Sequence, residues 1–207
     1  MCPGIAGRLQ LGLIMPLPLP EDRPRLEVTL DDGSHAQLSP LRPEDRDLLE
    51  EGMSQLSPQS RFARFGQGRG GLTRAELDYL SRVDQRRHVA WGAIVDNAVA
   101  GVGRYILIED EACAEVAITV VDRLQGRGVG RALFQALVAV ARSDGVEAFC
   151  FDALPQNLAV QRILKGLGVD LGTNQGLVMG RARIADLPES SLDAGFVSVM
   201  ERSRGPG

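Results

Sequence analysis

The segment Gln125–Arg131 reads Gln-Gly-Arg-Gly-Val-Gly-Arg, so three glycines alternate with larger residues. An apolar run, residues 116–121, precedes it and an amphipathic run, residues 129–141, follows it, which predicts the order strand, turn, helix. Glycines let the backbone approach a ligand and point several N–H groups one way, and the following helix adds its positive N-terminal end. The segment therefore predicts an anion site, most naturally for a pyrophosphate.

The composition is that of an ordinary globular protein, with 207 residues, 44% hydrophobic and 24% charged. A net charge of −4 argues mildly against a nucleic-acid partner. The cysteines, Cys2, Cys113 and Cys150, are scattered, and with His35 and His88 they do not complete a convincing zinc cluster. We therefore expect reduced thiols, no metal and a cytoplasmic protein.

The N-terminal region is apolar from residue 5 to residue 20, but Arg8 and three prolines interrupt it. It is too short and broken for a membrane span and lacks the features of a signal peptide, so no membrane partner is expected. A start at Met15 is an alternative. We expect a flexible Pro-rich arm over residues 1–25, one domain over residues 26–185, and a C-terminal tail over residues 186–207 that frays. Residues 196–200 of this tail offer a docking or homodimer contact.

Periodicity predicts a mixture of strands and helices along the domain. The expected strands cover residues 26–30, 35–41, 88–95, 98–108, 113–121, 146–152 and 177–184, and the expected helices begin at Pro43, Pro58, Thr73, Val129 and Asn157. Phe62 and Phe65 have helical spacing and are expected in the core. The glycine-rich residues 66–71 follow a helix and are expected to be a lid or linker.

Three kinds of site share the order strand, glycine-rich turn, helix. A P-loop needs Gly-Lys-Ser/Thr, whereas this chain has Gly130-Arg131-Ala132. A dinucleotide fold needs parallel βαβ units and a different glycine spacing. The third kind fits: residues 125–130 match the Q/R-x-x-G-x-G/A signature of the GNAT superfamily of N-acetyltransferases, and residues 157–168 resemble its N-x-x-A/M-x-x-L-x-x-x-x-G helix.

The resemblance implies an α+β GNAT fold, with a mixed, mainly antiparallel sheet flanked by helices and central strands that splay at the acetyl-CoA site. It covers residues 26–183. Residues 38–65, 72–93 and 114–117 further resemble the acetyltransferase domain of bacterial Pat-type protein lysine acetyltransferases. This implies acetyl transfer from the cosubstrate acetyl-CoA to an amine, either a protein lysine or a small molecule.

The resemblance also assigns the donor site. Backbone amides of the glycine-rich segment hold the pyrophosphate, and Arg127 and Arg131 add charge, although a solvated helix face explains either arginine equally well. Asn157 contacts CoA or only caps its helix. The backbone of the preceding strand pairs with the pantetheine arm. The expected cofactor-binding residues are Ile118, Thr119, Val120, Gln125, Gly126, Arg127, Gly128, Val129, Gly130, Arg131 and Asn157.

Catalysis needs a base, because a lysine ammonium with a pKa of about 10.4 must lose a proton before it attacks a thioester. Glu115 matches the family's strand glutamate, and we expect burial among apolar neighbours to raise its pKa. The alternative is a solvent-facing strand carboxylate. The position of the family's tyrosine acid is occupied by Leu164, so the thiolate leaves unassisted or is protonated by water.

Two other functions remain open from the sequence. One is a small-amine acetyltransferase acting on a metabolite, polyamine or antibiotic, and the acidic residues 109–111 suit a cationic substrate. The other is a non-catalytic sensor that binds acyl-CoA.

Overall fold

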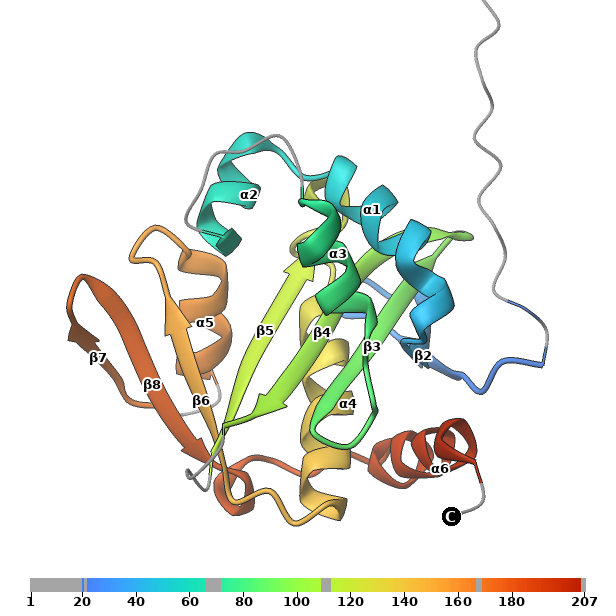
Figure 1. The fold of residues 1–207 in the computed structure, drawn as a ribbon. Coiled ribbons are helices and arrows are strands. Elements are labelled where there is room, and N and C mark those ends of the chain that lie inside the picture. Colours follow the sequence, from blue (N-terminus) through green and yellow to red (C-terminus); the bar gives the residue numbers. More distant parts are fainter. Residues whose placement is uncertain (1–19, 21, 66–71, 109–112, 167–168, 206–207) are drawn as a thin grey trace, which may run out of the picture.

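An eight-stranded sheet forms the centre of the computed structural model, which describes residues 20, 22–65, 72–108, 113–166 and 169–205. The strand order is β1-β2-β3-β4-β5-β6-β8-β7, and β5 and β6 are parallel whereas the other neighbours are antiparallel (Figure 1). The mainly antiparallel α+β fold expected from the sequence is therefore confirmed. The strands are β1 Leu26–Thr29, β2 His35–Pro40, β3 His88–Val95, β4 Ala98–Leu107, β5 Ala114–Val120, β6 Ala148–Ala153, β7 Leu171–Asn174 and β8 Leu177–Arg183.

Helices cover both faces of the sheet. Helices α1 and α3 lie on the face seen in front in Figure 1, and α4 and α6 pack together on the other face. The helices are α1 Arg46–Ser54, α2 Pro58–Phe65, α3 Arg74–Ser81, α4 Val129–Ser143, α5 Leu158–Gly166 and α6 Asp193–Arg204, with short 3-10 turns at Pro43–Asp45, Asp122–Leu124 and Ile184–Asp186.

Local sequence signals fix several of these boundaries. Asp96 and Asn97 both have positive φ (51° and 58°), as the tight hairpin turn between β3 and β4 requires. Thr73 and Glu76 form the expected capping box at the start of α3, where Thr73 Oγ1 accepts from the Glu76 N–H at 3.2 Å. These predictions from the sequence are confirmed.

The main core lies between the sheet and the α4–α6 layer. Helix α4 buries ten residues, including Leu133 and Leu137, because its apolar positions recur at helical spacing. Gly101 lets α4 and the strands pack closely, since a Cβ there would lie 2.6 Å from the Thr119 carbonyl oxygen. Next to Gly101 the register with β3 shifts, because Ala93 pairs with Gly101 whereas Ile94 pairs with Val99, so Ala100 is the extra residue of a bulge in β4.

The C-terminal region differs from the expected fraying tail. Residues 193–204 form α6, and Phe196 and Met200 are buried because they pack against the sheet and α4. The Phe196 ring stands edge-on to Trp91 with centroids 5.5 Å apart. These apolar residues therefore dock in the chain's own core, which is the first of the two alternatives expected for residues 196–200. Strand β7 was also not predicted, because its four residues are mostly exposed and polar.

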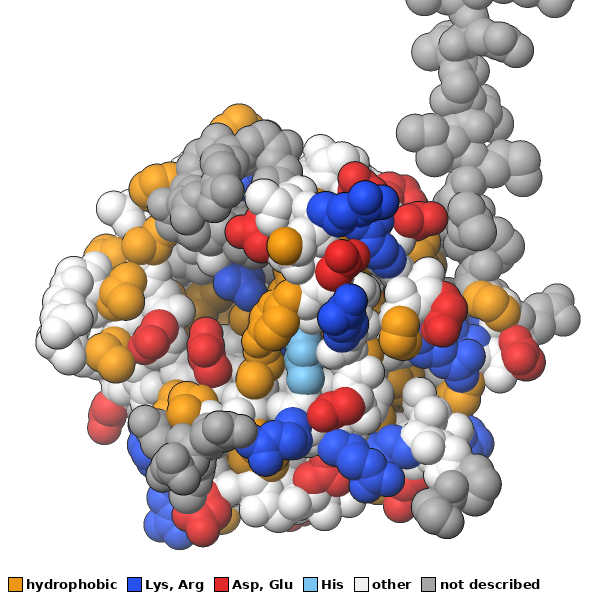
Figure 2. All heavy atoms as spheres, viewed as in Figure 1, with side chains coloured by type: hydrophobic (Ala, Val, Ile, Leu, Met, Phe, Trp, Pro, Cys, Tyr) orange, Lys and Arg blue, Asp and Glu red, His pale blue; other side chains and the backbone are white. Residues whose placement is uncertain are grey.

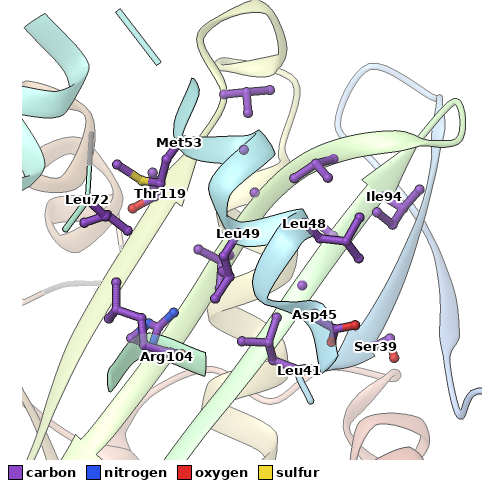
Figure 3. A pocket seen from close by; sticks show the side chains of 18 of the residues that line it. Ser39, Leu41, Asp45, Leu48, Leu49, Met53, Leu72, Ile94, Arg104 and Thr119 are labelled. Carbon is purple, nitrogen blue, oxygen red and sulfur yellow. The ribbon is translucent and has the colours of Figure 1, made fainter. Parts of the chain in front are cut away.

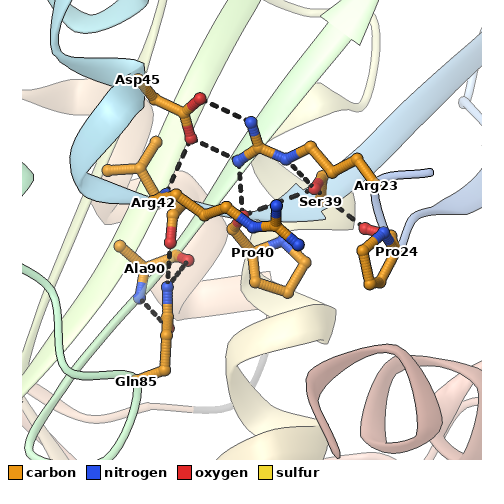
Figure 4. Close-up of polar contacts among 9 residues, drawn as sticks. Arg23, Pro24, Ser39, Pro40, Arg42, Asp45, Gln85 and Ala90 are labelled. Atoms are coloured by element: carbon orange, nitrogen blue, oxygen red, sulfur yellow. Dashed lines mark hydrogen bonds and ion pairs between the residues drawn. The ribbon is translucent and has the colours of Figure 1, made fainter. Parts of the chain in front are cut away.

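Two smaller expectations are wrong, and a third is not tested. Phe62 is exposed, because the short helix α2 turns this residue to solvent, whereas the side chain of Phe65 lies outside the described residues. Arg23 falls within the expected flexible arm but is buried, since its guanidinium binds Asp45 and the Pro40 carbonyl (Figure 4). Residues 66–71, expected as a lid or linker, lie outside the described residues.

The cysteines also differ from the expected reduced state. Cys113 and Cys150 form a disulfide with Cα atoms 6.1 Å apart, because the parallel pairing of β5 and β6 places them on neighbouring strands. Their separation of 37 residues hid this pairing from sequence spacing.

Candidate active site

The glycine-rich segment forms the turn between β5 and α4, as the sequence predicts. Gly126 and Gly128 have φ values of +77° and +99°, which other residues rarely adopt. Gly128 is the N-cap of α4, so the first amide groups of the helix point out of the turn. Gln125 closes the turn from the other side, where its side-chain amide donates to the Val120 carbonyl at 3.1 Å. The geometry is that of an anion site at a helix N-terminus.

Strands β5 and β6 separate next to this turn. They pair only through Ala114 with Phe149 and Glu115 with Cys150, whereas β5 pairs with β4 along its whole length. Beyond Glu115, the β6-facing edge of β5 has no strand partner among the described residues. The splay expected from the sequence is therefore present. It leaves the β6-facing edge of β5 at residues 118–120 open to an extended ligand, apart from the Val120 carbonyl, which accepts from Gln125.

Alternate β5 residues face opposite layers. Val120 and Ile118 lie toward the start of α4, within 3.9 Å of a Cβ built on Gly130. Thr119 faces the α1 side, where it lines a cavity. Because side chains alternate along a strand, Glu115 shares the face of Thr119. The strand thus presents one face to α4 and the other to the α1 side of the sheet.

Asn157 lies at the start of α5. Its side-chain oxygen accepts from the Val160 N–H at 3.3 Å, so the capping alternative accounts for this residue. A second cavity lies between α4 and α5, bounded by Arg131 and Gln135 on one side and Arg162 on the other. It begins at Arg131, in the first turn of α4.

Asp122, which lies just after β5, is hydrogen-bonded to the start of α2. Its carboxylate accepts hydrogen bonds from the Ser57 N–H at 2.6 Å and from the hydroxyls of Ser57 and Ser60. Burial acts to raise the pKa of Asp122, but these hydrogen bonds outweigh it and lower the pKa below its ordinary value. The charged carboxylate therefore holds the N-terminus of α2 against the end of β5.

Glu115 lies at the point where the two strands part. It is in register with Ile106 of β4 and Cys150 of β6, and its side chain is exposed. The expected burial is therefore wrong, because β6 diverges directly after this pair and leaves the carboxylate at an open position. The carboxylate is accessible to an external molecule.

A charged cluster on the same face was not predicted. Arg104 Nη1 donates to the Leu80 carbonyl at 2.9 Å and lies 3.0 Å from His88 Nε2. Burial and the charge of Arg104 lower the pKa of His88 to about 4, so the neutral ring accepts from the guanidinium. Burial and the charge of Arg64 lower the pKa of Arg104 to about 10. Burial lowers the pKa of Arg64 as well, while the charge of Glu115 raises it.

The sequence gives little sign of this cluster. Its members come from α2, β3 and β4, and single arginines on a helix or strand are ordinarily solvated. Positive and negative side chains are interspersed over this face and around its hollow (Figure 2).

An apolar cavity opens under α1 on the acceptor side. Leu49 and Met53 of α1, Leu72, and Thr119 of β5 point into it, and Arg104 stands at one end (Figure 3). At the opposite end the cavity reaches the buried ion pair of Arg23 and Asp45.

Neither tyrosine in the chain is placed as a proton donor to a departing thiolate. Tyr105 is fully buried and its hydroxyl donates to Asp144 at 3.2 Å; burial, followed by the Asp144 charge, raises its pKa. Tyr79 is an exposed residue of α3 that contacts the His88 ring. Leu164, at the position of the family's tyrosine, is buried.

The described residues contain no group of three or more His, Cys, Asp or Glu side chains arranged to hold a metal ion. None of the helices in the described ranges is long and apolar enough to cross a membrane.

Comparison with known proteins agrees with this geometry. The sequence profile of the acetyltransferase (GNAT) family matches residues 54–169, and the chain belongs to this family. It is an acetyl-CoA-dependent N-acetyltransferase, and the resemblance found in the sequence is confirmed.

Three relatives define its neighbourhood within the family. An acetyltransferase of Pseudomonas aeruginosa is 32% identical over 144 residues, which cover 68% of this chain and 77% of that protein. The acetyltransferase Pat of Mycolicibacterium smegmatis is 34% identical over 159 residues, covering 74% of this chain but only 47% of that protein. The GNAT domain of S. lividans PAT has a TM-score of 0.72 and 26% identity, over 77% of this chain and 96% of that domain. The chain thus spans about half the length of the Mycolicibacterium Pat.

Proposed function

We propose that this acetyltransferase modifies lysine side chains of proteins, with Glu115 as the general base. The observation that carries the acceptor assignment is the similarity to Pat at 34% identity, together with the fold match to a PAT domain. The resemblance covers the acceptor-side segments as well as the donor-binding turn.

In the proposed donor complex the pyrophosphate lies on the turn at residues 126–131, and the pantetheine arm lies along the open edge of β5 at residues 118–120. The free edge of β5 and the amides at the start of α4 support this placement. The cavity between α4 and α5 then receives the adenosine end, with Arg131 at its entrance. Asn157 contributes by fixing the start of α5.

In the proposed reaction an ammonium group enters from the α1–α3 side and transfers a proton to Glu115, directly or through one water. The freed amine nitrogen then attacks the thioester carbonyl. The C–N bond forms and the C–S bond breaks. The second proton of the nitrogen passes through water to the departing CoA thiolate, and Glu115 returns its proton to the solvent. The exposure of Glu115 at the mouth of the splay supports this role, because the acceptor can reach the carboxylate.

The acceptor assignment is tested by incubating the purified chain with acetyl-CoA and a panel of acyl-CoA synthetases, followed by peptide mass spectrometry. We expect acetyl groups on specific lysines. A parallel panel of small amines is assayed by release of the CoA thiol. Turnover on small amines with no modified protein lysine would overturn the protein-acceptor assignment, and no turnover on any acceptor would favour a CoA-binding sensor.

A further inference from the structure

The turn between β1 and β2 lies directly against the pyrophosphate turn. The Asp31 N–H donates to the Arg127 carbonyl at 3.1 Å. A Cβ built on Gly128 would lie 2.7 Å from the Asp31 backbone nitrogen, so the two turns touch at the level of their backbones. Two segments far apart in the chain are thereby joined at the donor site.

Two carboxylates of this turn pair with the two arginines of the donor segment. Arg127 Nε donates to Asp32 Oδ2 at 2.5 Å and Arg127 Nη2 donates to Ser34 Oγ at 2.9 Å. Arg131 is held more loosely, with Nη1 3.5 Å from Asp31 Oδ1. The Arg127 side chain is also less exposed than that of Arg131, at 30% against 66%.

Hydrogen bonds from Ser34 orient the Asp32 side chain toward Arg127. Its Oδ1 accepts from the N–H and the hydroxyl of Ser34, while its other oxygen faces the guanidinium. The hydrogen bonds from Ser34 and Arg127 lower the pKa of Asp32 to about 2, so this carboxylate stays charged across the working pH range. Arg127 therefore has a permanent, oriented partner, and its side chain is directed to the hairpin.

We propose that the β1–β2 turn is a positioning element of the acetyl-CoA site. Asp32 holds Arg127 in place, and Arg127 in turn supports the turn that binds the pyrophosphate. Arg131 alone supplies a mobile cationic contact to a phosphate. This assignment rests on the proposed binding of CoA at residues 126–131. Arg127 and Arg131 thus have different roles, which the sequence alone does not distinguish. Gly128 is required in this arrangement for its positive φ and because any side chain would strike Asp31.

The experiment measures CoA affinity by titration calorimetry for wild type and for the variants D32N, R127Q, D32N/R127Q and R131Q. Asparagine at position 32 retains an oxygen for Ser34 but removes the charge that faces Arg127. D170N is the matched control, because Asp170 is an exposed aspartate just before β7, at the opposite edge of the sheet from β1. Each variant is also assayed for kcat and for the KM of acetyl-CoA, well below its melting temperature.

We expect D32N and R127Q each to weaken CoA binding about fivefold, the value of one well-oriented ion pair. The double variant loses no more than either single variant, because both remove the same contact. The KM for acetyl-CoA rises while kcat changes little, which a general loss of stability would not produce. R131Q weakens binding and reduces its salt dependence, whereas R127Q keeps the wild-type salt dependence.

Unchanged CoA binding by D32N would overturn the proposal, since Asp32 would then have no part in the donor site. Tighter binding would overturn it too, since it would mean that Asp32 competes with the phosphate for Arg127. Additive losses in the double variant would overturn it too. If the wild-type chain itself does not bind CoA at this turn, the proposed donor site fails and this inference fails with it. If wild type binds CoA and D32N binds it equally well, only the role of the β1–β2 turn fails.

Discussion

At the scale of single residues, the acceptor face depends on groups whose ionisation is set by their neighbours. His88 is the clearest case, because Arg104 donates toward its ring and Tyr79 lies against it. Asp84 accepts the His88 backbone N–H at 2.8 Å and opposes the depression of its pKa. The ring must therefore be neutral for this cluster to stay intact.

The pKa of His88 predicts a pH dependence of stability. The unfolded imidazole takes up a proton near pH 6.5, whereas the folded one does so only near pH 4. Between these values the unfolded state binds more protons, so the free energy of unfolding falls as the pH falls. The contribution of neutral His88 to the free energy of unfolding is fully present above pH 6.5. Up to about 3 kcal/mol of it is lost at pH 4.

Urea melts at several pH values between 4 and 7 measure this loss. The variant H88Q keeps an acceptor for Arg104 but cannot titrate, so its stability should depend less on pH in this window. H35Q is the matched control, because His35 is exposed in the β1–β2 hairpin. Identical pH profiles for H88Q and wild type would contradict the assignment.

At the scale of elements, patterns in the sequence predicted the parts that local chemistry determines. The capping box at Thr73, the Asp96-Asn97 turn and the glycine-rich start of α4 each have a local cause, and all are present. Strand β7 was not predicted because its polar, exposed residues show no alternation of apolar and polar side chains. The exposure of Glu115 was not predicted because it depends on where β6 separates from β5. Contacts between distant elements leave no local signal.

The Cys113–Cys150 disulfide is another such contact, and it predicts a redox-dependent stability. It links the residue just before β5 to β6, next to the pairs Ala114–Phe149 and Glu115–Cys150 that join these two strands. The bond closes a loop with a sequence separation of 37 residues, for which the chain-entropy relation gives about 4 kcal/mol of stabilisation.

Denaturant melts with and without reductant should differ by an amount of this order. The double variant C113A/C150A should melt alike under both conditions, which separates the disulfide from other effects of the reductant. Equal stability of the oxidised and reduced wild-type chains would contradict this prediction.

At the scale of the whole molecule, the C-terminal helix is part of the core. Helix α6 packs against α4 and the β1–β2 hairpin, so the residues after the last strand help to support the hairpin that touches the donor turn. The Ser- and Gly-containing sequence around it favoured a fraying tail, whereas the apolar residues Phe196, Val199 and Met200 carry the packing.

Phe196→Ala should therefore destabilise the chain by about 3 to 5 kcal/mol, the usual cost of removing a fully buried phenyl ring. Phe62→Ala provides the matched control: this ring is 44% exposed, and its loss should cost less than about 1 kcal/mol. Thermal or urea unfolding measures both. Similar losses for the two variants would mean that α6 does not complete the core.

The central claim is that the turn at the start of α4 binds the donor and that Glu115, where β5 and β6 separate, removes a proton from the acceptor. The most direct measurement compares wild type with Glu115→Gln in acetyl-CoA turnover on an acyl-CoA synthetase and in CoA binding. Glu147→Gln is the control, since it removes an exposed carboxylate just before β6.

We predict that Glu115→Gln lowers kcat by about 100- to 10,000-fold, the range of general-base catalysis, while its CoA affinity and the activity of Glu147→Gln remain at wild-type values. Turnover by Glu115→Gln within a few-fold of wild type would contradict the account.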